Sequence, residues 1–359
     1  MIDPMNEYRT LSVMPTYQCT AACDHCGTYS HPKEKTRLPE EVMLSAIDQA
    51  IASDYKLVVF TGGEPTLAKE MLLRGIKRAA LGHVITRVVT NAWWASDDVS
   101  ASEWIDELKA AGLFEINFST GDQHARFVSL ENVLRATKAA AKAKLAICIM
   151  VEIVQDRSIT REKLETHPIY LKMLEESPDA YVRILESPWT PLSFVNINQY
   201  PDGITLNKHN LVTRTGCNSC LSTTTLQANG QLGACCGLGM REIPELQLGD
   251  IRNVPLAQAD ENAANDFLKR WIRVEGPEKI LAWAAEHDKT INWENMYAHK
   301  CQSCIKLYKD EKVRNVIKEH HTEKLGDVLL GEWLLYQYRP EENDENETPP
   351  DDTVSNITW

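Results

Sequence analysis

The sequence predicts an α/β fold in which parallel strands and helices alternate along the first half of the chain. Six apolar, strand-like runs recur between residues 11 and 186, and segments with helical periodicity separate them. Parallel strands need a crossover connection, so these repeats predict right-handed βαβ units, in an open sheet or in a barrel. The expected strands are residues 11–16, 57–61, 85–90, 114–119, 145–153 and 181–186.

The helices expected between these strands have start and stop signals of their own. Ser100 and Glu103 have the spacing of a capping box, and Gly112 follows as a C-terminal stop. Val99 and Trp104 flank that start in the positions of a hydrophobic staple. The expected helices are residues 40–52, 101–111 and 130–143.

Composition excludes several classes of protein. The chain has 359 residues, of which 43% are hydrophobic, so it can bury a large core and a smaller second one. No run approaches a membrane span, and the N-terminus lacks the features of a signal peptide. We therefore expect a cytoplasmic protein whose ten cysteines serve metal or redox chemistry rather than disulfides. A net charge of −13 without a basic stripe argues against nucleic acid as a partner.

Three cysteines, Cys19, Cys23 and Cys26, follow the first expected strand with the spacing C-x3-C-x2-C. Three thiolates on one short loop can hold three irons of a [4Fe–4S] cube and leave the fourth iron open. Electron-transfer clusters normally have all four irons covered by protein ligands, so an open iron indicates chemistry on a bound molecule. A structural zinc site or a reactive thiol site is the alternative, although zinc needs a fourth ligand close by.

A second motif, Gly62-Gly63-Glu64-Pro65, follows the next apolar strand in the segment LVVFTGGEPTL. Two adjacent glycines allow the backbone to approach a ligand closely, because they have no side chain. The Glu64 carboxylate can accept hydrogen bonds from an ammonium group.

Together, the two motifs resemble the signature of the radical S-adenosylmethionine (SAM) superfamily. The resemblance implies a partial six-stranded (β/α) barrel with its ligands at the carboxyl ends of the strands. It implies that SAM binds the open iron and the Gly62–Pro65 segment, with His25 in the place of an aromatic residue common before the last cysteine. Reductive cleavage of SAM then gives a 5′-deoxyadenosyl radical, which abstracts hydrogen from a substrate. An external electron donor such as flavodoxin or ferredoxin is implied as a partner.

The resemblance also suggests further contacts with SAM at the ends of the later strands. Ser119 would contact the ribose or the carboxylate, unless it only caps a turn. Ile147 would pack on adenine, and Arg183 would pair with the methionine carboxylate. Asn91, at the end of the third strand, is another cofactor-binding candidate. Cys148 is a candidate hydrogen donor to a substrate radical, with a small buried hydrophobe as the alternative.

A second set of cysteines follows residue 216. Asn229-Gly230 predicts a hairpin among them, and the arrangement resembles the auxiliary-cluster extensions called SPASM and twitch domains. No cysteine follows Cys304, so the resemblance implies a twitch-like fold with one auxiliary [4Fe–4S] cluster. Its implied ligands are Cys235, Cys301, Cys304 and one of Cys217 or Cys220, with Cys236 also a metal-ligand candidate; a zinc ribbon is the alternative.

These segments divide the chain into five expected parts. His320-His321, in the fourth part, is expected to be solvated because it lies on a charged helix, and its spacing suits no metal site. The parts are a radical SAM core at 1–190, a linker at 191–216, an auxiliary-cluster domain at 217–304, a helical segment at 305–339 and an acidic, disordered tail at 340–359.

The resemblance leads to a peptide maturase that cross-links, epimerises or rearranges a ribosomally made precursor peptide. The chain begins shortly before the first cysteine, so we expect either a separate leader-recognition protein as a partner or a peptide that the enzyme holds directly. One alternative is a twitch-type dehydrogenase of a small molecule, an aminocyclitol or a sugar alcohol. A non-enzymatic zinc-binding interaction protein is the alternative from another class.

Overall fold

One continuous sheet of nine strands runs through the described residues, 9–191 and 199–337, of the computed structural model. The strand order is β6-β5-β4-β3-β2-β1-β7-β8-β9, and every pair from β6 to β7 is parallel, whereas β8 and β9 are antiparallel. The strands are β1 Thr10–Val13, β2 Leu57–Phe60, β3 Ile85–Thr90, β4 Glu115–Thr120, β5 Ala146–Ile153, β6 Val182–Pro188, β7 Thr223–Leu226, β8 Gln231–Gly233 and β9 Gln247–Asp250.

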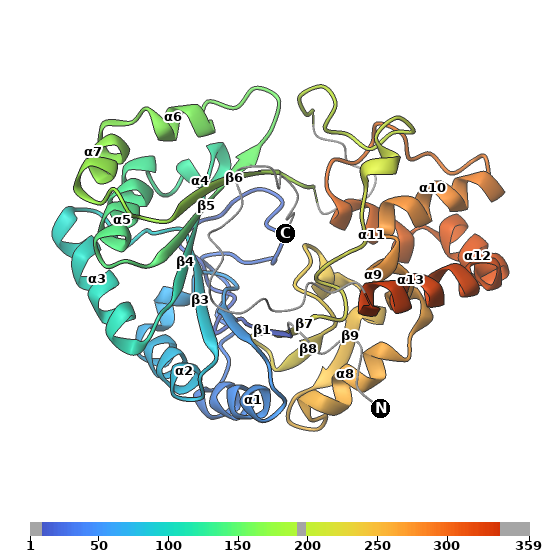
Figure 1. Ribbon diagram of the computed structural model, residues 1–359, viewed down its shortest axis with the longest axis horizontal. Coiled ribbons are helices and arrows are strands. Elements are labelled where there is room, and N and C mark those ends of the chain that lie inside the picture. The colour runs from blue at the N-terminus through green and yellow to red at the C-terminus, as the bar shows by residue number, and fades with distance from the viewer. Residues whose placement is uncertain (1–8, 192–198, 338–359) are drawn as a thin grey trace.

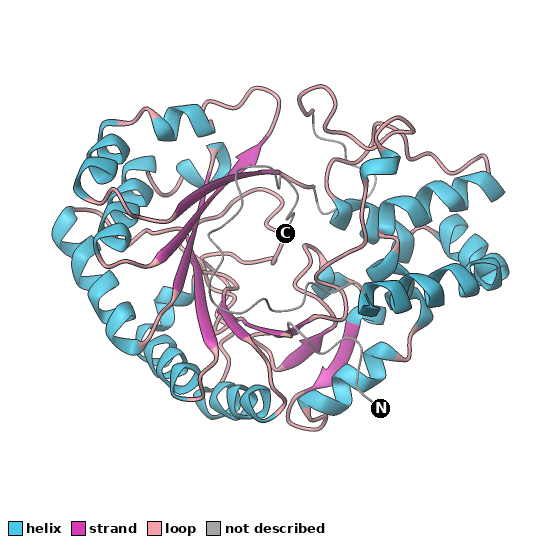
Figure 2. Ribbon diagram, viewed as in Figure 1, coloured by secondary structure: helices cyan, strands magenta, loops and turns pink. Residues whose placement is uncertain are grey.

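Helices cover the outer face of the curved sheet formed by β1 to β6 (Figure 1). Their apolar stripes pack against the strands, and the concave face turns toward the C-terminal half of the chain (Figure 2). This is the partial (β/α) barrel that the resemblance implies. The helices of this half are α1 Glu40–Ala52, α2 Lys69–Leu81, α3 Asp98–Ala111, α4 Asp122–Ala125, α5 Leu130–Lys142, α6 Arg161–Glu165 and α7 Pro168–Glu176, with a 3-10 turn η1 at Pro65–Ala68.

The start of α3 differs from the expectation. Asp97 is the N-cap, and its carboxylate accepts from the backbone N–H of Ser100 at 2.8 Å, so the helix begins earlier than the predicted capping box. Val99 is 68% exposed and forms no hydrophobic staple. Gly112 ends the helix in the left-handed conformation with φ of 105°, as predicted.

Side chains of the strands alternate between two environments. On β4, Ile116 and Phe118 are fully buried in the core beneath the helices. The residues between and after them, Asn117 and Ser119, line a cavity on the concave face. Period-two alternation therefore separates a packed outer face from an inner face that is available to ligands.

The predicted hairpin joins the barrel sheet rather than standing apart from it. β7 and β8 flank Asn229-Gly230 and pair antiparallel, and Gly230 has a φ of 90°. β7 also pairs in parallel with β1, with Thr10 opposite Thr223 and Val13 opposite Leu226. The sheet thus continues from the N-terminal half into the cysteine-rich half.

The remaining helices form a second core around Trp271. α11 runs through residue 304, where the auxiliary-cluster domain was expected to end, and the division into domains stays a prediction. The predicted tail at 340–359 lies outside the described residues. No helix in the described ranges has both the length and the apolar character of a membrane span. The helices are α8 Leu256–Ala264, α9 Phe267–Val274, α10 Pro277–His287, α11 Lys300–Lys309, α12 Glu311–His320 and α13 Leu325–Gln337, with 3-10 turns η2 Leu211–Thr213, η3 Met240–Glu242, η4 Pro244–Leu246 and η5 His321–Lys324.

Candidate functional site

The loop after β1 carries Cys19, Cys23 and Cys26, which we call the loop cysteines. All three are partly buried, and their sulfurs are close enough to influence one another electrostatically. Burial raises the pKa of Cys19 to about 11 and that of Cys23 to about 12, and the neighbouring thiols add to both shifts. Three sulfurs on one loop at the carboxyl end of β1 are a donor set that fits a [4Fe–4S] cluster with one open iron.

Gly62 and Gly63 hold this loop through its backbone. The N–H of Gly63 donates to the carbonyl of Thr16 at 3.0 Å, and the N–H of Glu64 donates to that of Gln18 at 2.8 Å. An added Cβ on Gly62 would lie 2.9 Å from the Thr16 oxygen, and one on Gly63 would overlap the Gln18 carbonyl. The glycines therefore allow two chain segments to approach each other closely. The sequence analysis expected them to allow the close approach of a ligand.

Glu64 lies beneath that contact, only 1% exposed. Its carboxylate accepts from the hydroxyls of Thr66 at 2.6 Å and Thr90 at 2.8 Å, and from the backbone N–H of Asn91 at 2.9 Å. Burial raises the pKa of this carboxyl, and the same hydrogen bonds oppose the rise. Pro65 follows as the first residue of η1. Glu64 thus joins the glycine turn to the end of β3, while its predicted contact with SAM stays a prediction.

Asn91 extends this network to the loop cysteines. Its side-chain amide donates to the hydroxyl of Thr20 at 3.0 Å and lies 3.8 Å from the sulfur of Cys19. The predicted site residue is therefore at the rim of the cysteine loop. His25 is exposed on the same loop with a φ of 55°, and its predicted role also stays a prediction.

Three other predictions are corrected by position. Ile147 is 1% exposed and packs in the core under the helices, on the face opposite Met150, which lines the cavity. Arg183 is the second residue of β6 and pairs in register with Cys148, so both lie near the amino ends of their strands.

The loop cysteines follow the carboxyl end of β1, so Arg183 is at the wrong end for the carboxylate of SAM. Cys148 is 1% exposed, and burial raises its thiol pKa. It therefore behaves as the small buried hydrophobe that was its alternative. Ser119 does line the cavity, as a SAM contact would require.

Glu152, near the end of β5, is a site residue that the sequence analysis missed. Its carboxylate accepts from the backbone N–H of Gln123 and lies 3.0 Å from Nδ1 of His124. The carbonyl of Gln123 in turn lies 3.8 Å from the sulfur of Cys23. The sequence signal for this residue was a carboxylate in an otherwise apolar strand. In the structure, Glu152 holds the Gln123–His124 segment, and Cys23 lies against that segment.

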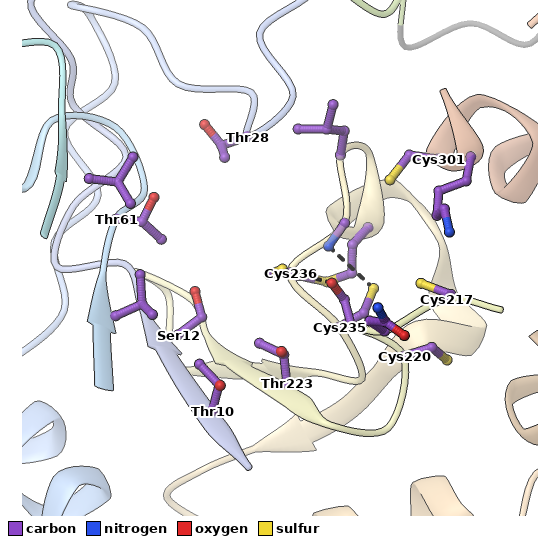
Figure 3. Close-up of a pocket in the computed structure, with 18 of the residues that line it drawn as sticks. Thr10, Ser12, Thr28, Thr61, Cys217, Cys220, Thr223, Cys235, Cys236 and Cys301 are labelled. Atoms are coloured by element: carbon purple, nitrogen blue, oxygen red, sulfur yellow. Dashed lines mark hydrogen bonds between the residues drawn. The ribbon is translucent and has the colours of Figure 1, made fainter. Parts of the chain in front are cut away.

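The six later cysteines converge on one wall of a cavity of about 400 Å³ (Figure 3). Burial raises the pKa of each thiol, and each lies within electrostatic reach of others in the group. The sulfurs of Cys235 and Cys301 both lie against Gly237, 3.2 and 3.5 Å from the position of an added Cβ. The six are Cys217, Cys220, Cys235, Cys236, Cys301 and Cys304.

The opposite wall of this cavity is the concave face of the barrel. In Figure 3, Thr10, Ser12, Thr28 and Thr61 stand on one side and the labelled cysteines on the other. Cys236 donates to the hydroxyl of Ser219 at 3.4 Å. The cavity is thus bounded by hydroxyl-bearing residues of the barrel strands and their loops on one side and by the six later cysteines on the other.

Arg241 joins the loop of the first cysteines to the segment that follows Cys236. Its guanidinium donates to the carbonyl of Thr28 at 2.7 Å and lies 3.4 Å from the ring centre of Tyr17. Beside it, the N–H of Gly239 donates to the carbonyl of Gly27 at 2.9 Å. The chain segments that carry the two cysteine sets are therefore in direct contact.

Comparison with known families agrees with the site described for the N-terminal half of the chain. Residues 13–167 match the model of the radical SAM superfamily. The chain contains a radical SAM domain. The cofactors of such a domain are SAM and a [4Fe–4S] cluster, and the loop cysteines lie within the matched segment.

One curated relative is similar to part of the chain. The chain is 22% identical over 180 residues to YydG of Bacillus subtilis (strain 168), whose name connects it with peptide biosynthesis. That match covers 49% of this chain and 52% of YydG, so the chain spans about half the length of this relative.

One solved structure shares the fold, and two others are similar over part of the chain. The structure of anSMEcpe with AdoMet and the Cp18Cys peptide has a TM-score of 0.52 at 15% identity, covering 90% of this chain and 99% of that one. The structure of Streptococcus suis SuiB bound to S-adenosylmethionine has a TM-score of 0.44 at 12% identity. The match covers 75% of this chain and 68% of that one. The structure of BtrN with AdoMet and 2-DOIA has a TM-score of 0.45 at 12% identity. The match covers 76% of this chain and 90% of that one.

Proposed function

We propose that the protein is a radical SAM peptide maturase that modifies a residue of a precursor peptide inside the cavity. The observation that carries this proposal is the cavity itself, which has the barrel face on one side and the six later cysteines on the other. The name of YydG and the peptide bound to anSMEcpe support a peptide as the substrate.

Each part of the site has a role in this proposal. When bound, SAM and the [4Fe–4S] cluster supply a 5′-deoxyadenosyl radical that removes hydrogen from a substrate C–H bond. The chain holds the loop cysteines in place through Gly63, Glu64 and Asn91. Ser119 lines the cavity and offers a hydroxyl to bound SAM or substrate. Enclosure by both halves of the chain excludes water from the reacting atoms.

The six later cysteines are proposed to bind one auxiliary [4Fe–4S] cluster. Cys235, Cys301 and Cys304 are the proposed common ligands, with either Cys217 or Cys220 as the fourth. Their burial and mutual proximity support such a cluster, because each thiol is desolvated beside others that a metal centre would neutralise. The cluster would accept an electron from the product or orient the substrate.

The proposal also names partners. A flavodoxin or ferredoxin would deliver the electron for SAM cleavage, and a separate protein would recognise the leader of the precursor peptide.

Anaerobic turnover tests the proposed function. The reconstituted protein is mixed with SAM, a reductant and candidate precursor peptides, and 5′-deoxyadenosine and peptide mass are followed, with deuterium uptake to detect epimers. A modified peptide formed by the wild type, and lost in Cys23→Ser, supports the proposal. Loss of two hydrogens from an aminocyclitol or polyol, with the peptides unchanged, would instead support the small-molecule dehydrogenase.

A further inference from the structure

Two imidazoles and one carboxylate meet at the edge of the C-terminal helices, outside the site described above. His287 is the last residue of α10, His320 is the last residue of α12, and Glu323 lies in η5. One ligand atom from each lies within 4.8 Å of the other two. The sequence analysis took His320-His321 as solvated because it could not see that His287 folds back beside it.

The carboxylate of Glu323 bridges the two imidazole rings of the triad. Glu323 reaches both rings, with one oxygen 3.3 Å from Nε2 of His287 and the other 2.9 Å from Nδ1 of His320. The two rings are stacked, with centres 4.2 Å apart and an angle of 26° between their planes. Two imidazole nitrogens and a carboxylate oxygen are the ligand types of a His₂Glu zinc site.

The elements that carry the triad are fixed by other packing. Trp283 lies edge-on to His287 at 4.7 Å and packs in turn against the buried Trp271 at 4.9 Å. Next to the triad, Lys324 contacts the carboxylate of Glu275 at 3.3 Å. The ligands are therefore brought together before any ion arrives, which lowers the cost of binding one.

We propose that His287, His320 and Glu323 bind one divalent transition-metal ion, with zinc as the expected occupant. The side chains of His287 and Glu323 are 25% and 49% exposed, so an ion can enter from solvent and water can fill the fourth position. Tetrahedral zinc places its ligand atoms about 3.4 Å apart; the three ligand atoms already lie within 4.8 Å, and binding would turn the stacked rings so that their nitrogens face the same ion. The ion would tie the end of α10 to the turn between α12 and α13 (Figure 1).

Zinc retention by the cluster-loaded full chain tests this site. The protein is reconstituted anaerobically with iron and sulfide, equilibrated with zinc and dialysed, and zinc and iron are measured in the same sample. We expect about one zinc per chain in the wild type, and its loss in His287→Ala, His320→Ala and Glu323→Gln with the iron content unchanged. His321→Ala is the matched control, because Nδ1 of His321 lies 3.2 Å from the carbonyl of Lys318 and not against Glu323.

Thermal unfolding gives a second readout. Added zinc should raise the unfolding temperature of the wild type and of His321→Ala, and should leave that of His320→Ala unchanged. Zinc that all three ligand variants retain would lie elsewhere and would overturn the proposal. A wild type that retains no zinc after dialysis would overturn it as well.

Discussion

Single atoms decide how the loop cysteines are held. Gly63 has no room for a Cβ against the carbonyl of Gln18, and the Glu64 carboxylate accepts hydrogen bonds from three different residues. These are properties of two chain segments packed against each other. The Gly62–Pro65 motif identified these residues from the sequence. Their role in packing against the cysteine loop became evident only from the structure, because the two segments are distant in the sequence.

Gly63→Ala is predicted to weaken the cluster site by displacing the loop. The added Cβ meets backbone that cannot rotate away, so we expect a loss of about 1–3 kcal/mol in stability and less iron per chain after reconstitution. Gly326→Ala is the matched control, because its added Cβ has nothing within 4 Å. Denaturant unfolding and iron analysis measure both effects, and equal iron contents in the two variants would contradict the packing argument.

Glu64→Gln tests the buried hydrogen-bond network. Glutamine replaces one acceptor oxygen by an NH₂ group that would face the donors on Thr66, Thr90 or Asn91. Leaving a buried donor unpaired costs about 1–3 kcal/mol, and the end of β3 should loosen. A lower rate of 5′-deoxyadenosine formation at full iron loading is expected, whereas an unchanged rate and stability would show that the network has no role.

At the scale of elements, the pairing of β7 with β1 joins the two halves of the protein. The hairpin around Gly230 was predictable from its turn residues, but its partner was not. Strands of four residues carry too little pattern to specify a neighbour that is distant in sequence, such as Thr10 opposite Thr223. The start of α3 was misplaced for a local reason, because Asp97 and Ser100 are both N-cap residue types and the spacing alone does not choose between them.

Arg241→Met tests the contact between the two cysteine sets. It removes a charged hydrogen bond to the carbonyl of Thr28 and a cation–π contact with Tyr17, together worth about 2 kcal/mol. We expect a shifted EPR signal of the cluster held by the loop cysteines and slower SAM cleavage. Arg252→Met is the control, because Arg252 is exposed and contacts Asp250 within the hairpin segment. The same change in both variants would contradict the proposed link.

In the whole molecule, the six later cysteines line a cavity together with the barrel face, and Arg241 connects their segment to the loop that carries the first three. The sequence predicted both sets and the barrel, because each carries a local pattern of spacing or periodicity. It misplaced Ile147 and Arg183. The face of the sheet on which a side chain lies, and its distance from the carboxyl end of the strand, depend on strand register, which the sequence does not show. It missed Glu152 and the triad around Glu323 because their partners are distant in the sequence.

Iron and sulfide analysis of the anaerobically reconstituted protein tests the two-cluster account most directly. We expect about eight irons per chain in the wild type. About four should remain when the loop cysteines are changed to serine, and about four when Cys235, Cys301 and Cys304 are changed instead. Four irons in the wild type that vanish with the loop cysteines alone, or zinc in place of iron on the six later cysteines, would contradict the account.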